Sequence, residues 1–113
     1  MHEVGMMKDL LDTAVERAKQ EGANHINEVH LRVGAASGVV PTSLELAFEV
    51  AKKGTIAEAA RLETEVVPVI CYCAHCNLEF QPADSLNECP ECHQTGCKVQ
   101  QGQEFELAFL EVS

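Results

Sequence analysis

The 113-residue sequence predicts an α+β fold in which two helices pack on a three-stranded sheet, with a zinc-ribbon-like domain of four cysteine ligands inserted before the last strand. Three observations predict it. Two segments place apolar residues at helical spacing, and three others alternate apolar with polar residues. All six cysteines lie between positions 71 and 97, so the first 70 residues have none. We therefore expect one domain from residues 1–70 and 101–113, and a metal-binding domain from residues 71–100.

The first helix and the first strand follow each other closely. Between residues 4 and 18 the apolar positions fall on one helical face: Val4, Met7, Leu11, Ala14, Val15 and Ala18. Gly22 is suited to the left-handed position that ends a helix. In residues 28–33, Val29, Leu31 and Val33 alternate with polar residues, which predicts a half-buried strand closed by Gly34.

A loop of small residues, 34–40, precedes the second helix. Pro41 is favourable in its first turn, and Gly54 marks its expected end. The apolar face of this helix consists of Leu44, Ala47, Phe48 and Ala51. A second strand is predicted from about residue 61 to 70, with Leu62, Thr64 and Val66 on one face and Pro68 weakening its far end. Residues 104–109 alternate again and predict the third strand.

Composition excludes several functional classes. The chain has 18 acidic and 8 basic side chains and a formal net charge of -10, which argues against nucleic-acid binding because phosphate contacts need Lys and Arg. No apolar run approaches the roughly 20 residues that span a bilayer, and no secretory leader is evident. We expect a cytoplasmic protein without membrane association. No acid-base pair, nucleophile triad or phosphate-binding glycine loop predicts an enzyme.

Two Cys-x-x-Cys turns dominate the chemistry. The first cysteine turn contains Cys73 and Cys76, and the second contains Cys89 and Cys92. Together they offer four thiolates to one tetrahedral ion, which suits structural Zn(II), although the ligands alone also fit iron. A thioredoxin-like redox role is less favoured because no βαβ pattern surrounds either turn. We expect Cys71 and Cys97 to stay reduced and to serve as structural or incidental residues.

The amino-terminal tripeptide offers a different ligand set. The Met1 amine, the His2 amide nitrogen and the His2 imidazole can wrap one ion, and Glu3 can add an oxygen. Nitrogen-rich planar sets favour Ni(II) or Cu(II). Taken alone, the tripeptide is more often accidental, with Glu3 serving the helix dipole. A cation is also poorly placed at a helix amino terminus, so binding would need residues 1–3 to precede the helix.

These features together are similar to a known family. Met1-His2-Glu3, the helix, the loop Gly-Ala-Ala-Ser-Gly-Val-Val-Pro from Gly34 to Pro41, and the cysteine turns resemble the HypA/HybF hydrogenase nickel-incorporation proteins. The resemblance implies a metallochaperone that delivers Ni(II) to the large subunit of [NiFe]-hydrogenase, with a HypB-type GTPase as partner. It places nickel on Met1, His2 and Glu3, in the domain of residues 1–70 and 101–113, and structural zinc on Cys73, Cys76, Cys89 and Cys92. The alternative function is a zinc-ribbon protein-interaction adaptor without specific nickel binding.

Overall fold

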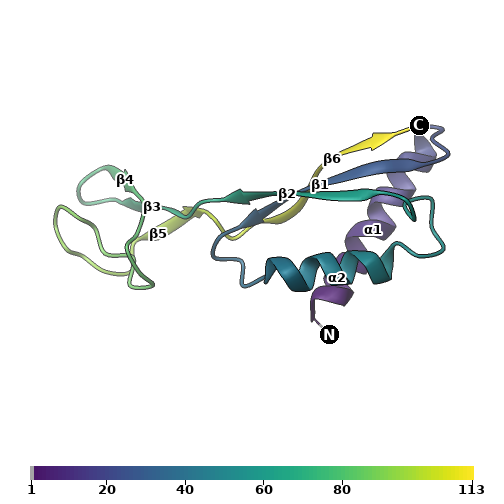
Figure 1. Cartoon of the computed structure of the whole chain (residues 1–113). Helices are drawn as coiled ribbons and strands as arrows, with labels where there is room; N and C mark the ends of the chain where they lie inside the picture. The colour runs from purple at the N-terminus through teal and green to yellow at the C-terminus, as the bar shows by residue number, and fades with distance from the viewer. Residues whose placement is uncertain (1) are drawn as a thin grey trace. The chain divides into compact units, whose positions relative to one another are not determined.

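The chain forms two helices and six strands over the part that the structure describes. The computed structural model describes the backbone of residues 2–113 and the side chains of residues 3–113. The elements, labelled in Figure 1, are α1 (His2–Gln20), β1 (Ile26–Gly34), α2 (Pro41–Ala51), β2 (Arg61–Val67), β3 (Ile70–Cys73), β4 (Leu78–Phe80), β5 (Lys98–Gln101) and β6 (Phe105–Val112). Neither helix is both long and apolar enough to cross a membrane.

The chain divides into two compact units. The first unit comprises Met1–Arg32, Val39–Glu65 and Phe105–Ser113, and the second comprises Val33–Gly38 and Val66–Glu104. These edges differ from the predicted domains, because residues 33–38, 66–70 and 101–104 belong to the second unit. Backbone hydrogen bonds hold them there: the Ala35 N–H donates to the Val67 carbonyl (2.8 Å), and the Ala36 N–H to the Gly102 carbonyl (2.7 Å). The assignment of one metal to each domain stays a prediction.

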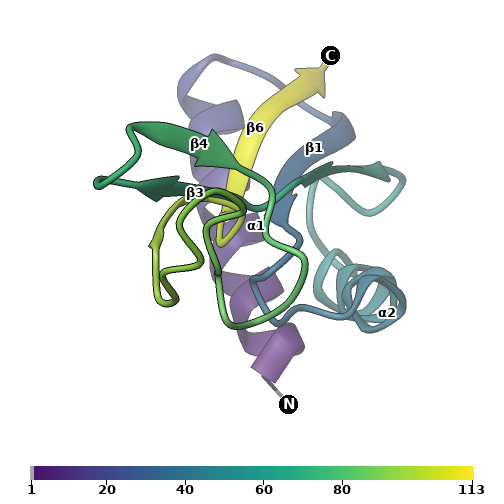
Figure 2. The same ribbon diagram turned by 90° about the vertical axis from the view of Figure 1, so that its left-hand side faces the viewer.

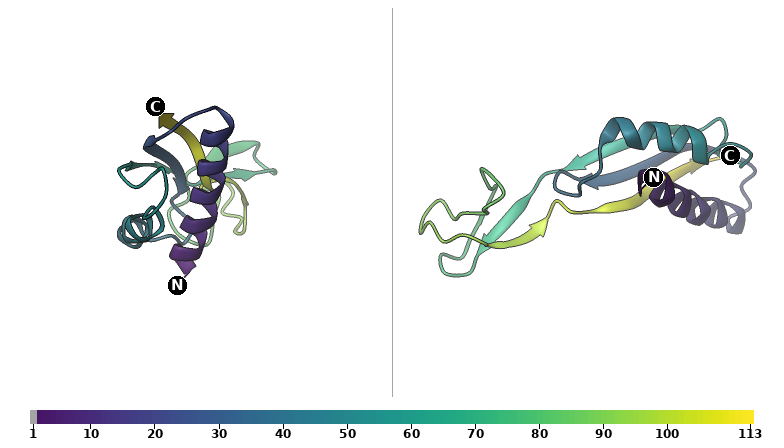
Figure 3. Two further views of the ribbon diagram at one scale, coloured as in Figure 1. Left: turned by 90° about the vertical axis from the view of Figure 1, so that its right-hand side faces the viewer. Right: turned by 90° about the horizontal axis from the view of Figure 1, so that it is seen from below.

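The first unit has the predicted two-layer arrangement. Its sheet has the strand order β2-β1-β6, and α1 and α2 lie on one face of it (Figure 3). The apolar face of α1 is buried through Met7, Leu11, Ala14 and Ala18. Gly22 ends this helix at φ 78°, as predicted, and the Ala23 N–H donates to the Ala18 carbonyl (2.9 Å). The core is completed by Val29, Leu31, Leu44, Ala47 and Phe48.

The predicted second strand is interrupted. Residues 61–70 were expected to form one strand, but β2 ends at Val67 and β3 begins at Ile70. Pro68 lies at the break, where it cannot donate a ladder hydrogen bond. Leu62, Thr64 and Val66 share one face of β2, but this face is not buried at its end, because Val66 is 60% exposed whereas Val67 is buried. Similarly, α2 ends at Ala51, three residues before Gly54, which adopts φ 76° in the following turn.

The second unit contains a small antiparallel sheet of order β4-β3-β5 (Figure 2). The central strand β3 pairs Cys71 with Phe80 on one side and with Val99 on the other. Two glycines permit close backbone approach beside it. A Cβ on Gly34 would lie 2.1 Å from the Gly102 backbone, and one on Gly102 would lie 2.6 Å from the Val69 Cα. Position 34, at the start of the 34–40 loop, therefore requires glycine, because any side chain there would collide with the Gly102 backbone.

Candidate functional site

Four cysteine sulfurs converge at one end of the small sheet. The Sγ atoms of Cys73, Cys76, Cys89 and Cys92 all lie within 4.8 Å of one another. Cys73 Sγ and Cys92 Sγ, which come from different cysteine turns, are 3.7 Å apart. A tetrahedron with metal–sulfur bonds of about 2.3 Å has edges of about 3.8 Å. The spacing and type of these donors therefore fit a tetrahedral zinc ion.

The two cysteine turns share a backbone design. The residue after each turn lies in the left-handed region: Asn77 at φ 52° and His93 at φ 64°. The Tyr72 hydroxyl donates to Asn77 Oδ1, and His93 Nδ1 lies 2.8 Å from Glu88 Oε2. Such a conformation costs a non-glycine residue about 1–2 kcal/mol, which these side-chain contacts help to offset. The sequence spacing predicted the turns but not the handedness of the residues that follow them.

Backbone N–H groups within the turns point at sulfur. The Glu91 N–H donates to Cys89 Sγ at 3.4 Å, two residues along the chain. In the first turn, the backbone N–H of Cys76, with smaller contributions from the Cys92 and Cys89 side chains and the His75 N–H, lowers the pKa of the Cys73 thiol to about 7. Burial, followed by the neighbouring sulfurs, raises the pKa of Cys76 to about 12. The backbone thus favours a thiolate at Cys73, whereas burial and the neighbouring sulfurs oppose one at Cys76, so four thiolates together need a cation.

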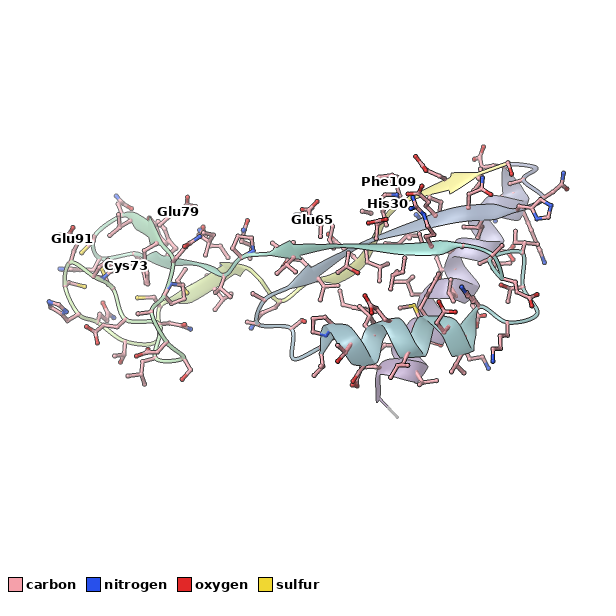
Figure 4. All side chains as sticks on the ribbon, in the orientation of Figure 1. His30, Glu65, Cys73, Glu79, Glu91 and Phe109 are labelled. Atoms are coloured by element: carbon pink, nitrogen blue, oxygen red, sulfur yellow. The ribbon has the colours of Figure 1, made fainter. Side chains whose placement is uncertain are left out.

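Cys71 and Cys97 lie outside this cluster. Cys71 is fully buried between Phe80 and Val99, and burial raises the pKa of its thiol. The Cys97 thiol donates to the Gln94 carbonyl at 3.5 Å. Figure 4 labels Cys73 in the cluster and Glu91 in the second turn. The structure thus brings together the four predicted zinc ligands and leaves Cys71 and Cys97 outside that group of sulfur atoms. The Cys97 thiol is nevertheless near it, because burial and then the neighbouring Cys73 raise the pKa of Cys97.

The amino terminus differs from expectation in one respect. Metal binding was expected to need residues 1–3 ahead of the helix, yet α1 begins at His2 and holds Glu3, half-buried, in its first turn. Met1 and the His2 side chain lie outside the described residues. The first four N–H groups of a helix have no intrahelical acceptor. Helical geometry therefore leaves the His2 amide nitrogen without an intrahelical hydrogen bond to lose on coordination.

One cluster was not predicted. His30 Nε2 lies 2.9 Å from Glu28 Oε1, and these groups cluster with Glu111. The i, i+2 spacing of Glu28 and His30 on one strand face could have indicated a pair. Glu111 is remote in the sequence, and only the pairing of β1 with β6 brings it there.

Comparison with known proteins identifies close relatives. Residues 1–112 match the family model described as hydrogenase/urease nickel incorporation, metallochaperone, hypA. The hydrogenase maturation factor HypA of Picosynechococcus sp. is 45% identical over 112 residues, covering 99% of each chain. The corresponding Roseiflexus factor is 41% identical, covering 98% of this chain and 91% of its own. The solution structure of the Ni metallochaperone HypA from Helicobacter pylori aligns with a TM-score of 0.73 and 26% identity, covering 97% of this chain and 96% of that one.

Proposed function

Because this chain belongs to the HypA family of nickel-incorporation metallochaperones, we propose that it binds Ni(II) at its amino terminus and delivers it to the large subunit of a [NiFe]-hydrogenase during maturation. The observation that carries the proposal is the family match over residues 1–112, which includes the Met1-His2-Glu3 tripeptide. We further propose a HypB-type GTPase as the partner in transfer, a cytoplasmic location, and no catalytic activity.

The proposed nickel ligands are the Met1 amine, the His2 amide and imidazole nitrogens, and the Glu3 carboxylate. Since the His2 N–H has no intrahelical acceptor, its loss to the metal breaks no helical hydrogen bond. The deprotonated amide and Glu3 supply charges of -1 each, which balance the +2 of the ion. This balance resolves the conflict between a cation and the positive end of the α1 dipole.

The proposed structural zinc ligands are Cys73, Cys76, Cys89 and Cys92. A bound zinc would hold the two cysteine turns together, and the small sheet has too little apolar core to do so alone. Four thiolates leave no open coordination position, so the site is suited to a structural role. Zinc here would organise the second unit and take no part in holding the transported nickel.

The decisive experiment is a calorimetric titration of Ni(II) into zinc-loaded protein with a native amino terminus. We expect tight binding that is lost in His2→Ala and in a version extended by two residues before Met1. His25→Ala, which removes an exposed histidine from the turn after α1, is the matched control and should bind normally. Binding should weaken in mild acid, because a histidine with a pKa of about 6.5 and an α-amine with a pKa of about 8 must lose protons.

Equal nickel affinity in the native, His2→Ala and extended proteins would refute the proposed site. One zinc per chain with no nickel bound to the native protein would favour the alternative function, a zinc-ribbon protein-interaction adaptor.

A further inference from the structure

The face of the β2-β1-β6 sheet opposite the two helices carries a polar cluster of three side chains. Glu28 and His30 flank the buried Val29 on β1, and Glu111 follows the half-buried Leu110 on β6. Alternate residues of a strand share a face, so these side chains project away from the helices. Figure 4 shows His30 and Phe109 on this side of the sheet. The cluster lies wholly within the first unit.

The three side chains bring their donor atoms within reach of one ion. One ligand atom from each of Glu28, His30 and Glu111 lies within 4.8 Å of the others. His30 Nε2 and Glu28 Oε1 are 2.9 Å apart, and two ligands at right angles with bonds of about 2.1 Å are about 3 Å apart. The spacing already present between these two donors thus equals that of adjacent ligands on an octahedral ion.

The imidazole is held in place by an aromatic ring. His30 stacks on Phe109 with a centroid separation of 3.9 Å and an interplanar angle of 15°. This contact restricts rotation of the imidazole and keeps Nε2 directed at Glu28. Such restriction lowers the entropic cost of binding, as packing around ligand side chains does in known metal sites.

The local charge also favours a dication. Arg61 Nη2 donates to Glu28 Oε2 at 2.7 Å, so the guanidinium and His30 engage different oxygens of one carboxylate. Arg61 Nη2 also lies 3.9 Å from Glu63 Oε1, so Glu28, Glu63 and Glu111 supply -3 against +1. Among residues 3–113 no Lys, Arg or His forms a salt bridge with Glu111. Arg61 lowers the pKa of Glu28, which keeps that ligand ionised.

We propose that Glu28, His30 and Glu111 form a second metal site, which binds a divalent transition-metal ion through one imidazole nitrogen and two carboxylate oxygens. Imidazole with carboxylates suits nickel, zinc and ferrous iron, and three protein ligands leave positions for water. The site is therefore exchangeable, unlike the four-thiolate cluster. It is independent of the amino-terminal nickel site, since it shares no residue with Met1, His2 or Glu3.

The test uses Ni(II) alone as the probe, added to zinc-loaded full-length protein whose amino terminus is extended by two residues. Six-coordinate Ni(II) in a nitrogen and oxygen site is paramagnetic and broadens NMR signals of nearby nuclei. We expect the amide signals of residues 28–30 and 109–111 to broaden in a saturable manner. Glu111→Gln, which changes an exposed side chain, and His30→Ala should each weaken apparent affinity at least about tenfold. Glu106→Gln is the matched control, because Glu106 is also on β6 but pairs with Arg32.

Each outcome supports or overturns the site. Broadening at this cluster that Glu111→Gln weakens and Glu106→Gln leaves unchanged supports it. Three results would overturn the site: no broadening at this cluster, broadening centred on His25, His75 or His93, or broadening that Glu111→Gln does not weaken. In each case Glu28 and His30 form only an ion pair. The His30→Ala result is used only if the amide spectrum of that variant keeps native dispersion. If it does not, the Glu111→Gln result alone decides whether the site exists. Because the extension blocks the amino terminus, failure here leaves the proposed nickel chelate unaffected.

Discussion

The substitution Gly34→Ala should destabilise the protein severely, although it adds one methyl group. A Cβ at this position would lie 2.1 Å from both the carbonyl carbon and the oxygen of Gly102, and 2.4 Å from the Gln103 nitrogen. Ordinary contacts are at 3.4 Å or more, so backbone must move by more than 1 Å. Gly102 is itself closely approached, since a Cβ built on it would lie 2.6 Å from the Val69 Cα.

The expected loss of stability in Gly34→Ala depends on which atoms must move to accommodate the methyl group. Overpacking a core commonly costs about 1–3 kcal/mol, and here the obstruction is the backbone of Gly102 and Gln103, which cannot rotate aside as a side chain can, so we expect about 3 kcal/mol or more. Each kcal/mol lowers the melting temperature of a domain of this size by about 4 °C. Thermal unfolding of the zinc-loaded variant, followed by circular dichroism, should therefore show a midpoint at least about 12 °C below that of the parent.

Two other glycines supply matched controls. Gly5 in α1 has nothing within 4 Å of a built Cβ, so Gly5→Ala should raise stability by about 0.5–1 kcal/mol through helix propensity. Gly38 has equal space but adopts φ 82°, so Gly38→Ala should cost about 1 kcal/mol. If Gly34→Ala melts within a few degrees of the parent, or no lower than Gly38→Ala, the close approach of residues 34 and 102 is wrong.

Two further predictions concern the metal cluster and the sheet face. Cys89→Ala should lose the tightly held zinc, measured as metal per chain after dialysis against a weak chelator, whereas Cys97→Ala should keep one zinc; zinc loss in both would contradict the assignment of four ligands. Arg61→Gln should lower the melting temperature at pH 7, because Arg61 lowers the pKa of Glu28 below its ordinary 4.5 in the folded state. A depressed carboxyl pKa contributes stability above the unfolded value and loses it as pH falls through the folded value. The difference between parent and Arg61→Gln should therefore shrink below about pH 4.5, and a constant difference would count against the ion pair.

The parts of this fold that sequence reasoning predicted are those set by local chemistry. The apolar spacing of Met7, Leu11 and Ala14 predicted the buried face of α1, because an isolated helical stripe has one way to face a core. Gly22 predicted its end, since few other residues adopt φ 78° without cost. The cysteine spacing predicted which four sulfurs converge, because short turns fix both members of each pair.

The parts that escaped prediction depend on contacts between distant residues. The alternation that predicted the third strand does not continue to its end, because Leu110 is half-buried, whereas Phe109 is 53% exposed and stacks on His30. The strands β4 and β5 are short, and their existence depends on pairing with β3. The requirement for glycine at position 34 is visible only once Gly102 lies against it. No single segment carries such information.

The amino-terminal and four-cysteine ligand sets use the backbone in opposite ways, and we infer that this difference is the basis of their different metals. In the cysteine turns the backbone keeps its protons and donates them to sulfur, as the Glu91 N–H does to Cys89 Sγ. Such donation lowers the electrostatic repulsion among four thiolates bound to one dication, a site with charges of -4 and +2 and a net charge of -2. At the start of α1 the His2 N–H has no intrahelical acceptor, so its nitrogen can itself become a ligand. Moving the amine by one residue would destroy that chelate and leave every cysteine contact intact. Extension of the amino terminus should therefore abolish nickel binding at the amino terminus, while the four-cysteine site keeps its one zinc per chain.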